Sequence, residues 1–232
     1  MYINSKPLLA ILLLAGCLSP HFRSAGAPTC MGQEDRFARW EDDIARFEKL
    51  TAESPVKPGG VVFVGSSSIR RWKLEQAFPG KGYVNRGFGG STLADSTHFA
   101  ERFILPLQPK QIVLYAGDND ISQGKNATEV VDDFNAFVTR VREGLPDVTI
   151  IFIAIKPSLK RWDLYPVMAD ANRAIAELCK EDDRLVYADI ATPMIGNQEK
   201  PAEDLFVKDL LHLSDKGYKI WDQVVGQALD SQ

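Results

Sequence analysis

The sequence has little cysteine and no concentration of positive charge. Only 3 of its 232 residues are cysteines, with no C-x-x-C and no spacing typical of a zinc site. The net charge is −4 and lysine and arginine do not cluster, so the composition gives no support for binding to nucleic acid or to a membrane surface. The chain also lacks internal repeats and low-complexity tracts. What remains is an ordinary globular composition, 45% hydrophobic and 25% charged, with a length that suits one α/β domain.

The N-terminus has the features of a leader peptide. Lys6 precedes an apolar run over 8–15, which is too short to span a bilayer of roughly 30 Å but suits the core of a signal peptide. The run ends in Leu-Ala-Gly-Cys17, which resembles a bacterial lipobox and implies cleavage before Cys17 and a lipid on its thiol. We therefore predict a signal peptide over 1–16, a tether over 17–32 and an exported domain over 33–232.

Two alternatives to the lipoprotein leader remain. The first is ordinary secretion, with cleavage near 25–27. The second is a buried helix, which no second apolar face and no helix cap supports. If Cys17 is lipidated, Cys30 and Cys179 remain, and they could pair in an oxidising compartment. Cys179 lies near the end of an amphipathic pattern, which favours a small buried apolar residue instead.

Five continuously apolar segments alternate with segments of helical periodicity. The strands are expected at 61–64, 83–85, 111–116, 149–155 and 185–190. The helices are expected at 34–52, 69–77, from 91 or 92 to 103, 128–141, 166–180, and from 214 or 215 to 229. Continuously apolar strands separated by helices predict an α/β fold with a parallel sheet that is covered on both faces.

The first expected helix carries an apolar stripe. Its members recur every three or four residues, as on one face of a helix: Phe37, Trp40, Ile44, Phe47 and Leu50. Such a stripe could form a ligand-binding set of aromatic rings, but this spacing is more typical of a helix that packs on a core. We expect the stripe to be core.

Polar or glycine-rich turns follow the expected strands. They are the serines at 66–68, the segment 86–92, the turn 117–120 and, after the last strand, a loop with Asp209 and His212. Because the carboxyl ends of parallel strands lie at one edge of a sheet, these turns should lie close together. The serines could instead only cap a helix. The segment 86–92 matches neither a dinucleotide fingerprint nor a P-loop, so we expect no cofactor. No spacing in the chain resembles a zinc site, so we expect no metal either.

This set of residue types suits nucleophilic acyl transfer. A serine hydroxyl is a weak nucleophile unless a neighbouring base takes its proton, and histidine has a suitable pKa for that task. An aspartate can hold the imidazole in one tautomer. Backbone N–H groups beside glycine and an asparagine amide can bind the oxyanion that forms.

In order along the chain, these turns resemble sequence blocks of the SGNH hydrolases, also called GDSL-type esterases. Phe63–Ser67 resembles block I, and Asn85–Gly90 resembles block II. Gly117–Asp120 matches the G-x-N-D of block III, and Asp209–Leu213 contains the D-x-x-H of block V. The resemblance implies a flavodoxin-like, three-layer α/β/α sandwich around a five-stranded parallel sheet of order 2-1-3-4-5. It also makes 33–232 an SGNH hydrolase domain.

The resemblance implies a role for each matched residue. Ser67 would be the nucleophile. Its own N–H, the N–H of Gly90 and the side chain of Asn119 would form the oxyanion hole. His212 would act first as general base and then as general acid, and Asp209 would orient it.

One position departs from the family pattern. Block I usually reads G-D-S, and Ser66 stands here at the aspartate position. The spacing of Phe63 and Trp72 around Ser67 favours Ser67 as the nucleophile, and Ser66 and Ser68 remain the alternatives.

Other polar residues have competing interpretations. His98 falls inside an expected helix, which favours a surface or core role. His212 could cap the helix that follows it, and Asp120 is expected to bond locally in its turn. Three further residues are either substrate contacts or solvated side chains: Arg70, Arg71 and Lys156.

The resulting hypothesis is a metal-independent serine esterase held outside the cytoplasm, on the periplasmic side of a bacterial envelope. Its substrates would be short acyl esters, lysophospholipids or O-acetylated envelope glycans. It would not bind nucleic acid, and it would contact a membrane only through its lipid anchor. The alternatives are a non-catalytic binding lipoprotein of the same fold and a flavodoxin-like nucleotide or phosphate binder, since one fold hosts many functions.

Overall fold

The computed structural model describes residues 1–2 and 36–231. Apart from residues 1 and 2, the predicted leader and tether lie outside the described residues. Cys17 and Cys30 lie there too, so the lipidation site and the pairing of Cys30 with Cys179 stay predictions. Cys179 itself is half-buried, and the pKa of its thiol is raised to about 12 by burial and by the charge of Asp182.

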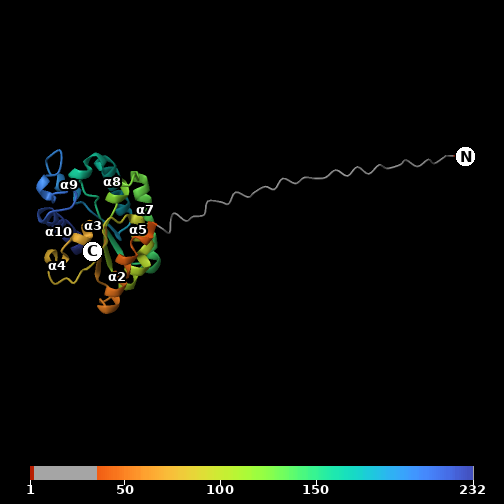
Figure 1. Ribbon diagram of the computed structural model, residues 1–232, viewed down its shortest axis with the longest axis horizontal. Helices are drawn as coiled ribbons and strands as arrows, with labels where there is room; N and C mark the ends of the chain where they lie inside the picture. The colour runs from red at the N-terminus through yellow and green to blue at the C-terminus, as the bar shows by residue number, and fades with distance from the viewer. Residues whose placement is uncertain (3–35, 232) are drawn as a thin grey trace.

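A five-stranded parallel sheet forms the centre of the fold (Figure 1). Its strands are β1 (Val61–Gly65), β2 (Val84–Gly87), β3 (Gln111–Tyr115), β4 (Thr149–Ile153) and β5 (Leu185–Ala188). They lie in the order β2-β1-β3-β4-β5, and each neighbouring pair is parallel. The predicted three-layer architecture and strand order are therefore confirmed.

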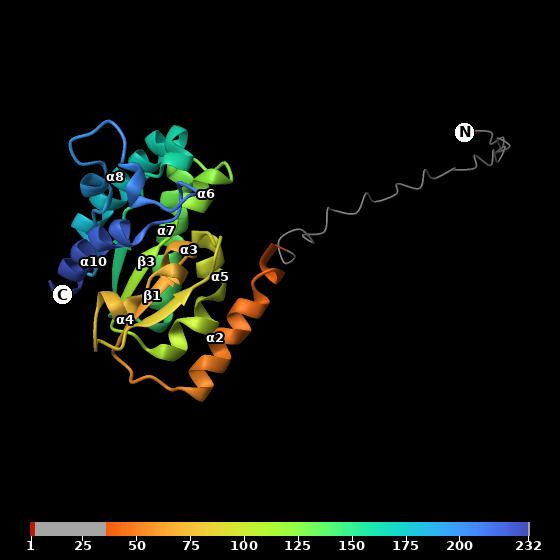
Figure 2. The same cartoon turned by 60° about the vertical axis from the view of Figure 1, so that its left-hand side comes forward.

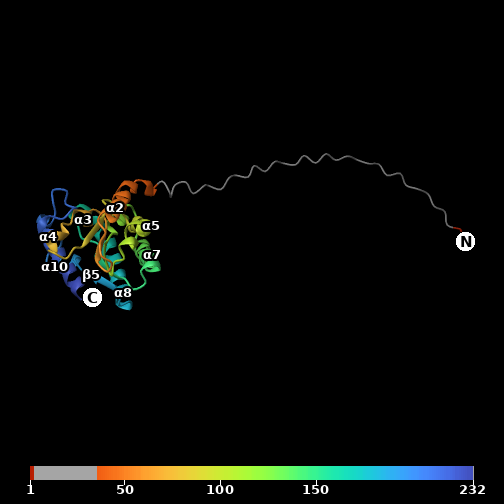
Figure 3. The same ribbon diagram turned by 90° about the horizontal axis from the view of Figure 1, so that it is seen from below.

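Helices cover both faces of the sheet (Figure 3). One face packs against α2 (Glu41–Glu53), α5 (Leu93–Phe103), α7 (Ala127–Gly144) and α8 (Tyr165–Glu181). The other packs against α3 (Ser67–Arg71), α4 (Leu74–Ala77), α9 (Ala191–Ile195) and α10 (Asp215–Asp230). Side chains of β1 alternate between the two apolar cores, with Val62 and Val64 in the first and Val61 and Phe63 in the second. This alternation explains why the strand is apolar at every position.

Two predicted helices are shorter or broken. The helix expected over 34–52 is interrupted at Trp40, and α2 begins at Glu41. Its expected core residue Leu50 is 41% exposed, so this assignment was wrong; within α2 the stripe is buried at Ile44 and Phe47. The helix expected over 69–77 is divided into α3 and α4 at Trp72, whose backbone is extended and whose indole N–H donates to Asp222.

Several strands end at other residues than the sequence predicted. β2 continues to Gly87, beyond the expected end at 85, because Arg86 and Gly87 pair with Val64 and Gly65 of β1. β3, β4 and β5 end one or two residues earlier than expected, at 115, 153 and 188. The chain therefore leaves the sheet sooner than hydrophobicity alone indicates, and the residues that follow are buried in loops at its carboxyl edge.

Gly65 allows the chain to turn toward α3 at the end of β1. Its φ is 136°, and a Cβ at this position would lie 1.9 Å from the carbonyl oxygen of Tyr115. Only glycine permits that approach between β1 and β3. The three serines that follow are consequently held at the carboxyl edge of the sheet. Figure 2 labels α3 and α6 (Asp118–Ser122), the short helices that follow β1 and β3.

Within residues 1–2 and 36–231, no helix combines the length and apolar character needed to cross a membrane.

Candidate active site

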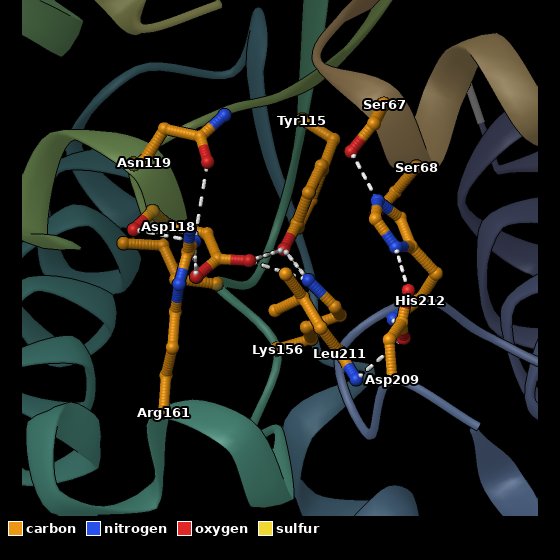
Figure 4. A network of polar contacts seen from close by, with 12 residues as sticks. Ser67, Ser68, Tyr115, Asp118, Asn119, Lys156, Arg161, Asp209, Leu211 and His212 are labelled. Atoms are coloured by element: carbon orange, nitrogen blue, oxygen red, sulfur yellow. Dashed lines mark hydrogen bonds and ion pairs between the residues drawn. The ribbon is translucent and has the colours of Figure 1, made fainter. Parts of the chain in front are cut away.

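Of the three adjacent serines at 66–68, Ser67 is the one whose hydroxyl bonds to His212. It begins α3 and is half-buried, whereas Ser66 and Ser68 are only 3% and 1% exposed. The Ser67 Oγ lies 2.9 Å from Nε2 of His212 (Figure 4). The geometry thus distinguishes Ser67 from the two alternatives that the sequence left open.

Asp209 holds the other side of the His212 ring. Its Oδ2 lies 2.6 Å from Nδ1 of His212, and its Oδ1 accepts the backbone N–H groups of Leu211 (3.0 Å) and His212 (2.9 Å). Burial raises the pKa of the Asp209 carboxyl, but the bonds from the ring and from both backbone N–H groups outweigh it and hold this pKa well below its usual range. Asp209 therefore stays ionised and can keep the Nδ1 of His212 protonated, which leaves Nε2 as the acceptor facing Ser67.

The loop that carries the Asp209–His212 pair is fixed at several points. The Val207 N–H donates to the carbonyl of His212 (2.9 Å), and Leu210, in the left-handed region at φ 57°, accepts the N–H of Lys160 (3.0 Å). His212 does not cap the following helix. Ser214 does, because its Oγ accepts the N–H of Gly217 at 3.2 Å.

The expected oxyanion donors come from two turns that are tied together. Gly90 follows β2 in a positive-φ conformation and is exposed, and Asn119 lies in the first turn of α6. The side-chain amide of Asn119 donates to the carbonyl of Ser91 at 2.9 Å, so the two turns lie side by side.

The buried side chain of Asp120 also links these two turns. Its carboxylate accepts the N–H of Gly117 (3.0 Å), which is the expected local bond, and also that of Leu93 (3.2 Å) across the site. Burial raises the pKa of Asp120 to about 6. Its role is to join segments, and it contacts neither Ser67 nor His212.

A buried polar network adjoins Asn119, and the sequence did not predict it. Lys156 is 1% exposed, so neither of its expected roles, substrate contact or solvated side chain, is correct. Its Nζ donates to Asp118 Oδ2 (2.5 Å) and to the hydroxyl of Tyr115 (3.0 Å), while Arg161 pairs with Asp118 Oδ1 at 2.6 Å (Figure 4). The available signal was a lysine placed directly after the continuous apolar run of the fourth strand.

The other candidates lie at the surface. Arg70 and Arg71 are exposed, and the Arg70 guanidinium lies over Gly89, since a Cβ there would be 2.8 Å from its Cζ. His98 is exposed and stacks on Phe37, with ring centroids 3.8 Å apart, in agreement with the expected surface role. In the described part of the chain, no three histidine, cysteine or acidic residues lie close enough to hold a metal ion.

A parallel sheet of order 2-1-3-4-5, with serine, glycine, asparagine and histidine gathered at its carboxyl edge, is the architecture of the SGNH hydrolases. Residues 57–220 match the model of the GDSL-like Lipase/Acylhydrolase family, and the chain belongs to this family of hydrolases.

Solved structures share the fold at low sequence identity. A Streptococcus pneumoniae protein named for platelet activating factor is 21% identical, with a TM-score of 0.74 over 85% of this chain and 96% of its own. A GDSL-like lipase from Bacteroides thetaiotaomicron is 19% identical (TM-score 0.66; 81% and 98% covered). An acetyl-xylooligosaccharide esterase from Geobacillus is 16% identical (TM-score 0.60; 74% and 95% covered). A search of curated proteins returned no match to this sequence.

Proposed function

We propose that this protein is a serine esterase that hydrolyses carboxylic esters through an acyl-enzyme. The observation that carries the proposal is the continuous hydrogen-bonded chain from Ser67 Oγ through the His212 ring to the ionised carboxylate of Asp209, at 2.9 and 2.6 Å. Both distances are within hydrogen-bond reach, as required of a nucleophile, its general base and the group that orients the base.

In the first half of the reaction, Ser67 Oγ attacks the ester carbonyl carbon while His212 Nε2 takes its proton. The carbonyl oxygen becomes an oxyanion, which accepts hydrogen bonds from the N–H groups of Ser67 and Gly90 and from the Asn119 amide. When the tetrahedral intermediate collapses, the bond to the alcohol oxygen breaks. The proton on His212 passes to that oxygen, and the alcohol leaves.

In the second half, water replaces the alcohol. His212 Nε2 takes a proton from the water as it attacks the acyl carbon, and the same oxyanion donors bind the second intermediate. Collapse breaks the bond to Ser67 Oγ, which recovers its proton from His212, and the carboxylic acid leaves. Asp209 stays ionised throughout and stabilises the imidazolium that forms in each half.

The proposed substrates are short acyl esters, lysophospholipids or O-acetylated envelope glycans. Ser67 is half-buried and Gly90 is exposed, so the site is accessible from solvent, which supports substrates larger than methyl or ethyl esters. The resemblance in fold to an acetyl-xylooligosaccharide esterase supports the glycan class. No role for nucleic acid is proposed.

Ester hydrolysis and covalent labelling test the proposal together. The protein is incubated with p-nitrophenyl acetate, longer acyl homologues and an O-acetylated oligosaccharide, and separately with a fluorophosphonate, followed by peptide mass spectrometry. We expect turnover and a single phosphonylated residue, Ser67, because only an activated serine reacts with the phosphonate. Folded protein that neither turns over any ester nor is labelled would support the non-catalytic binding lipoprotein instead.

We also propose that the enzyme is an envelope lipoprotein on the periplasmic side, anchored through Cys17. The support is the lipobox-like sequence that ends at Cys17. In a bacterial host given an alkyne-tagged fatty acid, the wild type is expected to take up the label and fractionate with membranes, and Cys17→Ser to lose both properties. Equal labelling of the two proteins would contradict the anchor and favour ordinary secretion.

A further inference from the structure

Arg161 contacts the side chain of Asn119 from the side opposite the expected oxyanion. Its Nη1 donates to Asn119 Oδ1 at 3.1 Å, and the two hydrogens of this nitrogen are shared with the main-chain oxygen of Asp118 (3.1 Å) and with Asp118 Oδ1 (2.6 Å) (Figure 4). Asn119 Nδ2 in turn donates to the carbonyl of Ser91 at 2.9 Å. An amide nitrogen carries two hydrogens, so one N–H of Asn119 is satisfied and one remains for the oxyanion.

These partners permit only one orientation of the Asn119 amide. If the amide were flipped, its NH2 group would face the Arg161 guanidinium and its oxygen would face the carbonyl of Ser91. Both contacts would be repulsive, donor against donor and acceptor against acceptor. A flipped amide would also present an oxygen in place of an N–H to the developing oxyanion.

The position of Arg161 is itself fixed by buried charge. Its side chain is 18% exposed, and it shares the Asp118 carboxylate with Lys156. Burial alone would raise the pKa of Asp118, but the two cations lower it below its usual range, so Asp118 is ionised and the cluster of two cations and one carboxylate carries a net positive charge. Arg161 lies in the 3-10 segment Leu159–Leu164, whose Lys160 N–H also bonds to the loop that carries Asp209 and His212.

We propose that Arg161 is a positioning residue of this esterase: it holds the Asn119 amide in the orientation that donates to the oxyanion. This inference rests on the proposed function. The positively charged cluster behind Asn119 polarises the amide through its oxygen, which strengthens the N–H on the opposite side. A guanidinium suits the task because it stays charged and binds several acceptors at once.

A double-mutant cycle on the full-length chain tests whether Arg161 acts through Asn119. Asn119→Ala removes one oxyanion donor and is expected to lower kcat about 100- to 1000-fold. Arg161→Met is expected to lower kcat about 10- to 100-fold, with KM changed less than about threefold. The reason is that the weakened interaction is the hydrogen bond from the Asn119 amide to the oxyanion, which forms only in the transition state. The double variant should then be no slower than Asn119→Ala by more than about threefold, since coupled residues are not additive.

Two further variants separate positioning from a general loss of stability. Arg161→Lys keeps a charge near Asn119 and is expected to retain more activity than Arg161→Met. Arg142→Met is the matched control: Arg142 is 16% exposed and pairs with Asp182 at 2.5 Å, at the opposite edge of the sheet. Its kcat should stay within about twofold of wild type. The proposal would be overturned if the loss of kcat in the double variant equalled the product of the two single losses. It would also be overturned if Arg161→Met had the kcat of wild type.

A measurement that needs no turnover tests the same claim. The side-chain NH2 resonances of Asn119 are assigned by NMR through their absence in Asn119→Ala. In Arg161→Met we expect these resonances to move upfield, because the amide oxygen loses its cationic donor, and in Arg142→Met to stay unchanged. Unchanged resonances in Arg161→Met would overturn the positioning role. An inactive wild type in which the resonances shift as expected would overturn the proposed esterase function and leave the contact intact.

Discussion

Replacing Ser67 with alanine is expected to lower kcat/KM for p-nitrophenyl acetate by about 10⁴- to 10⁶-fold, because the attacking oxygen is lost and water must replace it. His212 would keep its bond to Asp209, so the folded structure should change little. Ester hydrolysis by the purified variant, followed spectrophotometrically, measures the effect. Circular dichroism and thermal unfolding should match those of wild type.

The neighbouring serines provide controls for this result. The hydroxyl that bonds to His212 Nε2 is that of Ser67, whereas Ser66 is buried and the buried Oγ of Ser68 has no hydrogen-bond partner. Ser66→Ala and Ser68→Ala should therefore stay within about tenfold of wild type, an effect of roughly 1.4 kcal/mol or less. If Ser66→Ala removed turnover and Ser67→Ala did not, the assignment of the nucleophile would be wrong.

Replacing Asp118 with alanine is expected to lower the free energy of unfolding by about 3–5 kcal/mol. The carboxylate is the shared partner of two cations, and Lys156, at 1% exposure, would keep only the Tyr115 hydroxyl as a hydrogen-bond partner. An uncompensated buried ammonium is strongly unfavourable, whereas loss of a whole pair can be nearly neutral. Urea unfolding near neutral pH measures the change.

The effect of Asp118→Ala should also depend on pH. The pKa of Asp118 is lowered in the folded state, against the effect of burial, by the charges of Lys156 and Arg161. The carboxylate of Asp118 therefore contributes fully to the free energy of unfolding above its pKa in the unfolded chain, near 3.9. This contribution is lost as the pH falls through the lower pKa of the folded state. The difference in the free energy of unfolding between wild type and Asp118→Ala should become smaller in strong acid.

Asp182→Ala is the comparison for the Asp118 result. Asp182 also pairs with an arginine, but its side chain is 28% exposed, and the change should be only about 1 kcal/mol. Equal losses in the free energy of unfolding for the two variants would show that the buried cluster stabilises the fold no more than an exposed ion pair does.

Sequence patterns predicted much of the site because the parallel fold brings distant turns to one edge. Ser67 and His212 are separated by 145 positions, yet both follow continuously apolar strands whose carboxyl ends meet. The strand order followed from the family resemblance. The length of each element was less predictable: buried apolar residues follow the ends of β4 (Ala154 and Ile155) and β5 (Ile190), and nothing in the local sequence indicates where pairing stops.

The sequence by itself determined the alternation of strands and helices, the two-sided burial of the sheet and the residue types gathered at its edge. The family spacing favoured Ser67 among the three adjacent serines, but only the tertiary structure decided which hydroxyl meets the histidine, because all three have the same chemistry and differ in exposure and direction. It also decided the place of Lys156 and Arg161 beside Asp118. A charged residue in a sequence is expected at the surface, and its burial becomes visible only when the folded chain supplies a partner such as Asp118.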